Sequence, residues 1–203
     1  MKVRKVLMKY SFFALISRMK NITRWSLMRN SASENIQEHS LMVAVIAHAL
    51  AVISRDVFGC KTDPGLAASM ALFHDASEIF TGDMPTPIKY FDPEIMSAYK
   101  KVESVASRKL LAALPGEMRP AYKTLLSPGV DDETTALVKA ADRLAAYIKC
   151  LEELKAGNLE FRQAAEQSRN RLSELDKPEV EYFIENFIPA FELTLDELDF
   201  SFD

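Results

Sequence analysis

Residues 72–83 read LFHDASEIFTGD, and the rest of the chain is organised around this stretch. Within ten positions the stretch contains three carboxylates and one of the chain's three histidines, among side chains that are mostly apolar or small. If the stretch is helical, Glu78 lies four residues after His74 and three after Asp75, so these side chains share neighbouring faces. Buried charged groups usually pair with one another or bind metal. The stretch alone therefore fits a metal site and a purely structural His–carboxylate network equally well.

The composition is that of a globular protein, with 203 residues of which 48% are hydrophobic and 27% charged. Few glycines and many Ala, Leu, Glu and Lys residues favour helices. A net charge of -4 argues against a partner that is a nucleic acid polymer, although a local basic pocket can still bind a small anion. Cys60 and Cys150 form no CxxC motif, which is consistent with a reducing cytoplasm. We expect no membrane location, because no apolar run reaches the length of about 20 residues that a spanning helix needs.

Apolar residues recur at helical spacing along most of the chain, and no alternating run predicts a strand. Residues 38–53 are apolar nearly all round, which is typical of a central core helix. Residues 21–33, which include the only tryptophan, break the helical pattern and predict a loop. The sequence predicts a single all-α domain over residues 1–203, with its core at about 10–190. We expect its helices at 10–20, 38–53, 66–80, 93–114, 118–126, 131–155, 160–175 and 179–187.

Four residues on three of these helices form a candidate metal site. His39 starts the core helix, His74 and Asp75 lie on the next helix, and Asp142 lies in a small-residue stretch of a later one. Two imidazoles and two carboxylates suit a borderline divalent ion such as Mn, Co, Fe or Zn, and leave positions open for water and substrate. Taken singly, a histidine at a helix start is more often a cap, and an aspartate beside an arginine more often a salt bridge. His48 follows His39 by nine residues on the same helix and therefore points elsewhere, so we expect it to be structural.

The order His, then His-Asp, then Asp resembles the HD superfamily of metal-dependent phosphohydrolases. The HD pair alone is unspecific, but its combination with further segments over most of the chain resembles the bacterial YfbR-type 5'-deoxynucleotidases. These segments are Arg24-Trp25, Glu38-His39-Ser40, His74-Asp75-Ala76-Ser77-Glu78, Thr81-Gly82-Asp83, Pro85-Thr86-Pro87-Ile88-Lys89 and Ala141-Asp142. The resemblance implies an HD-type helical bundle, a homodimer, and hydrolysis of a small-molecule substrate, a 5'-deoxynucleoside monophosphate, to deoxynucleoside and phosphate.

The resemblance also implies a role for each matching residue. The metal ligands would be His39, His74, Asp75 and Asp142. The acid/base pair near the scissile phosphate would be Glu78 and Asp83. The residues that contact substrate would be Arg24, Trp25 and Asp83, with Lys89 as a further candidate.

Each of these roles has an alternative. Glu78 would orient or deprotonate the attacking water, or hydrogen-bond a ligand histidine. Asp83 would protonate the leaving 5'-oxygen or hold the adjacent loop. Arg24 suits a phosphate oxygen or a sugar hydroxyl, and Trp25 would shape the sugar pocket or staple its loop. Lys89 is a candidate for phosphate or an ordinary surface lysine.

Two other functions share much of this pattern. One is another HD phosphohydrolase, acting on a nucleoside triphosphate, a cyclic nucleotide or another phosphoester. The other is a catalytically silent HD module that senses a nucleotide, against which the intact ligand and acid/base positions argue. For a dimer interface, the apolar pairs 182–183 and 187–188 are candidates, unless they belong to the core.

Overall fold

The computed structural model describes residues 10–85, 88, 91–127 and 133–198. Its α-helices are α1 (Phe12–Ile16), α2 (Ile36–Asp56), α3 (Pro64–Phe73), α4 (Glu78–Thr81), α6 (Pro93–Ala112), α7 (Arg119–Leu126), α8 (Glu133–Lys155), α9 (Arg162–Ser173) and α10 (Pro178–Asn186). Short 3-10 helices are η1 (Ser17–Asn21), η2 (Gly116–Met118), η3 (Leu159–Phe161), η4 (Ile188–Glu192) and η5 (Leu195–Glu197). Within the described ranges the only β pairing is an isolated bridge between Thr23 and Asn35, which confirms the all-α prediction.

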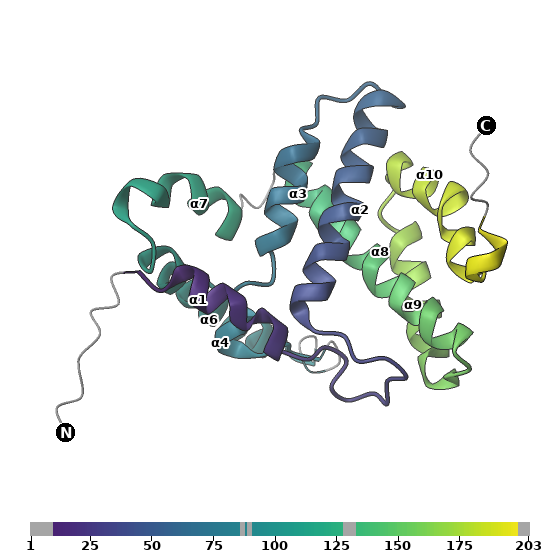
Figure 1. The fold of residues 1–203 in the computed structure, drawn as a ribbon, viewed down its shortest axis with the longest axis horizontal. Helices are drawn as coiled ribbons and strands as arrows, with labels where there is room; N and C mark the ends of the chain where they lie inside the picture. Colours follow the sequence, from purple (N-terminus) through teal and green to yellow (C-terminus); the bar gives the residue numbers. More distant parts are fainter. Residues whose placement is uncertain (1–9, 86–87, 89–90, 128–132, 199–203) are drawn as a thin grey trace.

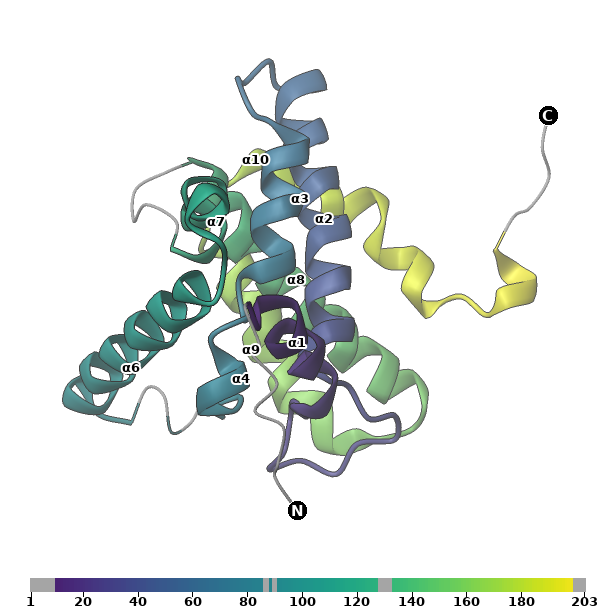
Figure 2. The same cartoon turned by 60° about the vertical axis from the view of Figure 1, so that its left-hand side comes forward.

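Helices α2, α3 and α8 form the centre of the molecule. Figure 1 shows α2 and α3 side by side and α8 passing behind both. Their facing sides are lined by small and aliphatic residues, among them Ala47, Leu50, Ala71 and Leu144, none of which is exposed. Helices α1, α6 and α7 flank one side of this centre and α9 and α10 the other (Figures 1 and 2).

The direction of α2 and α3 brings the candidate ligands together. The N-cap of helix α2 is Asn35, whose side chain accepts from two backbone N–H groups while the Glu38 side chain accepts from the Asn35 N–H. Helix α3 runs back beside α2 after a short connection, so the start of α2 and the end of α3 lie at the same end of the pair (Figure 1). His39, in the first turn of α2, therefore lies near His74, which follows α3.

Helix α2 has 21 residues and a mean hydropathy of 1.6, which is long and apolar enough to cross a membrane. The expectation that no segment reaches that length was therefore wrong. However, 56% of its apolar window is buried within the protein. Its hydropathy is explained by its central position between α3 and α8.

The stretch around His74 and Asp75 is not the continuous helix predicted over 66–80. Helix α3 ends at Phe73, residues 74–77 form a turn, and α4 begins only at Glu78. In a continuous helix the Ala71 carbonyl would accept from the N–H of Asp75. Instead it accepts from the His74 N–H at 3.3 Å and from the His74 imidazole at 2.7 Å. The His74 imidazole thus occupies the Ala71 carbonyl that the next residue of a helix would use, and the chain forms a turn instead.

The apolar C-terminal pairs belong mostly to the core. Phe183 and Ile188 are 7% and 6% exposed, and Tyr182 packs against the central cluster. Only Phe187 is substantially exposed, at 45%. Of the two readings for these pairs, the structure favours the core.

Candidate metal and substrate site

The contact between His74 and the Ala71 carbonyl fixes the tautomer of this histidine. A carbonyl can only accept a hydrogen bond, so the His74 Nδ1 must carry the proton that it donates at 2.7 Å. In the neutral imidazole, Nε2 then carries a lone pair, and this buried atom has no hydrogen-bond partner. Backbone carbonyls hold metal-binding histidines in this manner.

The four predicted ligand residues converge on one point. One ligand atom each from His39, His74 and Asp142 lies within 4.8 Å of the others. His39 Nε2 is 3.0 Å from Asp142 Oδ1, and His74 Nε2 is 3.9 Å from the same oxygen. Asp75 Oδ2 lies 3.1 Å from His74 Nε2 and 3.7 Å from His39 Nε2. The sequence prediction brought together four residues that the fold places in contact.

The electrostatics of this cluster favour positive charge at its centre. Burial alone lowers the pKa of His74, but the Asp75 and Asp142 carboxylates and the Ala71 carbonyl raise it overall, to about 9. Burial also raises the pKa of Asp75 and Asp142, yet the two histidines outweigh it and lower both carboxyl pKa values below their ordinary range. The cluster therefore stabilises both ionised carboxylates and an added positive charge.

The donor set fits a divalent ion. The His74 Nε2 lone pair faces a carboxylate oxygen 3.1 Å away, and two electron-pair donors at this distance need a proton or a cation between them. Imidazole nitrogens with carboxylate oxygens suit Mn, Co, Fe or Zn, and none of the cluster's ligands is a cysteine. A purely structural network would also leave no buried His39 Nδ1 without a hydrogen-bond partner, as it is here.

Arg24 enters the cluster from the loop between η1 and α2. Its guanidinium Nη1 donates to Glu34 Oε2 at 2.9 Å, and its Nε has no hydrogen-bond partner. Burial alone would lower the pKa of Arg24. The nearby carboxylates of Glu34, Asp142, Asp75 and Asp83 outweigh this effect, so the pKa is raised overall. The positively charged guanidinium of Arg24 thus lies near the candidate metal ligands, where it could bind a phosphate group.

Glu34 is a residue that sequence reasoning missed. It pairs with Arg24, and its Oε1 lies 3.9 Å from His39 Nδ1. In the sequence it stands among several capping residues before α2, and the cap is in fact the next residue, Asn35. The position five residues before a ligand histidine was the only signal, and it is too weak to single Glu34 out.

Trp25 follows Arg24 with its backbone in the left-handed region, at a φ of 57°. Its ring packs on Phe161 with centroids 5.3 Å apart, and its buried Nε1 has no hydrogen-bond partner. The packing supports the reading of Trp25 as a staple of its loop. The unpartnered indole N–H is compatible with contact to a ligand as well, since buried indole groups usually find a partner.

Glu78 and Asp83 frame the short helix α4. Glu78 opens α4 one turn after His74 and is 6% exposed. Gly82 ends α4 with a φ of 72°, a conformation open to glycine, and its carbonyl accepts from the Tyr99 hydroxyl at 3.3 Å. Tyr99 of α6 thereby fixes the turn that precedes Asp83. Lys89 lies outside the described residues.

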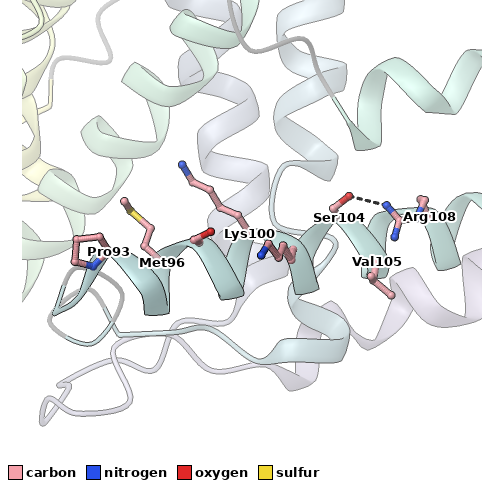
Figure 3. Close-up of a pocket in the computed structure, with 8 residues that line it drawn as sticks. Pro93, Met96, Lys100, Ser104, Val105 and Arg108 are labelled. Atoms are coloured by element: carbon pink, nitrogen blue, oxygen red, sulfur yellow. Dashed lines mark hydrogen bonds between the residues drawn. The ribbon is translucent and has the colours of Figure 1, made fainter.

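A separate pocket of about 530 Å³ lies along α6 (Figure 3). Met96, Lys100 and Ser104 are among the residues that line it, and Figure 3 shows them along one helix. It contains neither the converging ligands nor Arg24 and Trp25. The chemistry of the side chains, rather than the size of a pocket, locates the candidate site.

Comparison with solved structures defines the class of this fold. An HD-domain phosphohydrolase from Listeria innocua superposes with a TM-score of 0.77 at 24% identity, covering 89% of this chain and 88% of that one. The cyanophage S-2L HD phosphohydrolase DatZ, solved with dA and one catalytic Zn²⁺ ion, superposes with a TM-score of 0.58 at 22% identity, covering 87% and 96%. The helical bundle is therefore that of the HD phosphohydrolases, as predicted.

Sequence comparison defines the family. The sequence model of the YfbR-like 5'-deoxynucleotidase family matches residues 11–191 of this chain. A 5'-deoxynucleotidase of Vibrio cholerae is 53% identical over 92% of this chain and 97% of its own length, and one of Erwinia tasmaniensis is 50% identical over 92% and 95%. The chain belongs to the YfbR-like 5'-deoxynucleotidase family, which confirms the resemblance and the prediction of an enzyme.

Proposed function

We propose that this protein hydrolyses 5'-deoxynucleoside monophosphates to deoxynucleoside and phosphate, with a divalent ion held by His39, His74, Asp75 and Asp142. The observation that carries the proposal is the convergence of ligand atoms from His39, His74 and Asp142 within 4.8 Å, beside the buried cation of Arg24. A site that collects metal ligands and an arginine suits a phosphate ester. The names of the YfbR-like relatives supply the substrate class.

The bound ion would neutralise phosphoryl oxygens and lower the pKa of a water molecule. Its identity is proposed as Co, Mn, Zn or Fe, in line with the mixed nitrogen and oxygen donors. The chain's own contribution is to hold the ligands: the Ala71 carbonyl orients His74, and the Asp142 carboxylate contacts His39.

Glu78 is the residue we propose as general base. It is buried and opens α4 four residues after the candidate ligand His74. It would take the proton from the attacking water, while Asp83 would protonate the leaving 5'-oxygen or anchor the substrate. Hydrolysis of a phosphate ester needs such positioning more than it needs covalent chemistry.

Arg24 and Trp25 are proposed to bind the substrate. The Arg24 guanidinium would take a phosphate oxygen through the Nε that has no hydrogen-bond partner in the protein. Trp25 would shape the sugar pocket and exclude a 2'-hydroxyl by its bulk, since an apolar pocket alone rejects an added hydroxyl poorly. Lys89 stays a candidate for phosphate on the sequence pattern alone.

A matrix of metals and substrates tests this function. Purified protein is stripped, loaded with Co, Mn, Zn or Fe, and assayed for phosphate release from dAMP, AMP, dATP and a cyclic nucleotide. We expect release from dAMP well above that from AMP, and none from the triphosphate or the cyclic nucleotide. No phosphate release from any nucleotide, with metal demonstrably bound, would contradict the proposal, and preference for dATP would favour another HD phosphohydrolase.

Three further properties are part of the proposal. A cytoplasmic location is supported by the two cysteines, Cys60 and Cys150, which are free thiols. A single domain over residues 1–203 remains a prediction. A homodimer is supported by the exposed apolar side chains of α2, where Leu41 and Val45 are 60% and 59% exposed. Light scattering of the wild type and of Leu41→Asp tests it, with a monomeric wild type as the contrary result.

A further inference from the structure

The loop from Ile22 to Asn35, which carries Arg24 and Trp25, is held at two places. At its base, the Arg24 N–H donates to the Glu34 carbonyl at 2.9 Å, and Thr23 and Asn35 form the isolated bridge. At its tip, Ser31 and Ala32 contact α8, more than 100 residues later in the chain. A loop of this length has few intrinsic preferences, so these contacts decide its conformation.

The tip contacts converge on one buried carboxylate, that of Glu153, which is 1% exposed. Its oxygens accept from the Ser31 hydroxyl at 2.6 Å, the Ser31 N–H at 2.8 Å and the Ala32 N–H at 3.3 Å. They also accept from the Asn158 amide at 2.8 Å and the Lys149 ammonium at 2.5 Å. Lys149 in turn donates to the Ala32 carbonyl at 2.7 Å, and Asn158 to the Arg29 carbonyl at 2.7 Å.

The same stripe of α8 carries the candidate metal ligand. Lys149 and Glu153 follow Asp142 by seven and eleven residues, and in a helix both spacings return to nearly the same face. One rigid helix therefore sets the distance between the metal site and the point where the loop tip is fixed. Loss of the Glu153 hydrogen bonds would release the loop tip from the helix that carries Asp142.

Trp25 is connected to this network through packing. Its ring lies on Phe161 at 5.3 Å, and the Lys149 Nζ lies 6.0 Å from the centroid of the same Phe161 ring. The lysine thus contacts both the loop backbone, at Ala32, and the aromatic residue that supports Trp25. The loop tip and the tryptophan side chain share one support.

We propose that Lys149 and Glu153 are positioning residues, which hold the 22–35 loop in the conformation that presents Arg24 and Trp25 to the substrate. The inference rests on the proposed function for its kinetic consequences, but its structural part stands on the contacts alone. Neither residue would touch the substrate. Their loss would weaken substrate binding and leave the metal site intact.

Trp25 is the only tryptophan, so intrinsic fluorescence reports on this loop directly. The test compares acrylamide quenching of Trp25, and kcat and KM for dAMP, in the metal-loaded wild type, Glu153→Gln and Ser31→Ala. We expect quenching to increase in both variants, KM to rise about tenfold in Glu153→Gln and less in Ser31→Ala, and kcat to stay within about threefold. Ser31→Thr keeps the hydroxyl, so its quenching and its KM should equal those of the wild type.

The matched control is Glu179→Gln on α10, because Glu179 is also buried beside a lysine, with Lys177 Nζ at 3.5 Å, and carries no loop contact of this kind. We expect its quenching and KM to equal those of the wild type. If Glu153→Gln does not fold, the test of the inference is Ser31→Ala, because Ser31 is exposed and its substitution should not prevent folding. Unchanged quenching and KM in a folded variant would overturn the inference. If the wild type itself releases no phosphate, the proposed function fails, while the quenching results still decide whether the network positions the loop.

Discussion

Two polar clusters lie along one stripe of α8, and they differ in how completely their hydrogen bonds are satisfied. Around Asp142, His39 Nδ1 has no hydrogen-bond partner, and His74 Nε2 has only the Asp75 carboxylate oxygen at 3.1 Å, a contact that needs a proton or a cation between the two atoms. Around Glu153, the carboxylate accepts from five donors, and Lys149 bonds both to it and to a carbonyl. The clusters also differ in exposure, because the Asp142 side chain is 42% exposed whereas Glu153 is 1% exposed, so the first cluster is the one that a ligand can reach.

The difference indicates which cluster binds a ligand and which holds the structure. Leaving a buried polar atom unpaired costs roughly 1–3 kcal/mol, and folded proteins leave few such atoms. The unpaired atoms around Asp142, together with Arg24 Nε of the neighbouring loop, therefore indicate a site that a ligand completes. The saturated cluster at Glu153 is complete, and its role is to fix a loop.

The largest expected effect comes from removing a ligand of the first cluster. His39→Ala and Asp142→Ala should each lower phosphate release from dAMP about a thousandfold or more, because transition-state stabilisation by the ion is lost. His48→Ala is the matched control, since His48 lies on the same helix with an exposed side chain. Equal activity of His39→Ala and His48→Ala would show that the cluster is only structural.

Next in size is the replacement of Glu78 by glutamine. The change keeps the shape of the side chain and removes its basicity, so kcat should fall by a factor of about 10² to 10⁴. Metal content, measured by plasma mass spectrometry, should be unchanged. Full activity of a metal-loaded Glu78→Gln would assign the residue to support of the ligand histidine and not to proton transfer.

Arg24→Lys is expected to have an intermediate effect. The lysine keeps the positive charge beside Glu34 but lacks the fork of N–H donors, so KM for dAMP should rise about 10- to 100-fold. Steady-state kinetics with Arg29→Lys, an exposed arginine of the same loop, provide the comparison. If Arg24→Lys and Arg29→Lys bind dAMP equally well, Arg24 acts only on Glu34.

The smallest effect concerns pH and the second cluster. Burial raises the pKa of Glu153, but hydrogen bonds from Lys149, Ser31 and Asn158 outweigh it and lower the pKa well below its ordinary 4.5. The ionised carboxylate therefore stabilises the fold above about pH 5, and this contribution is lost as the pH falls towards the folded-state pKa. The free energy of unfolding of the wild type should exceed that of Glu153→Gln at pH 7, and the gap should narrow at about pH 3.5. A gap that is constant over this range would contradict the assignment.

The sequence predicted the first cluster better than the second. His39 and Asp142 lie on helices whose apolar periodicity is plain, and the order of the ligands resembles a known family. The helical placement of His74 was wrong, because its imidazole donates to the Ala71 carbonyl that a continuing helix would use. The spacing of apolar residues carries no information about such a side-chain contact. The Glu153 network was not foreseen, since its partners at Ser31 and Ala32 are 122 and 121 residues away. Periodicity describes one helix at a time, whereas this network needs the packing of a loop on a distant helix.

The central claim is that His39, His74 and Asp142 complete a metal site, whereas Lys149 and Glu153 do not belong to one. Equilibrium dialysis of the stripped protein against Co²⁺, followed by the metal content per chain, tests it directly. We expect one ion per chain in the wild type, in His48→Ala and in Glu153→Gln, and almost none in Asp142→Ala. One tightly bound ion in folded Asp142→Ala, or none in the wild type, would contradict the account.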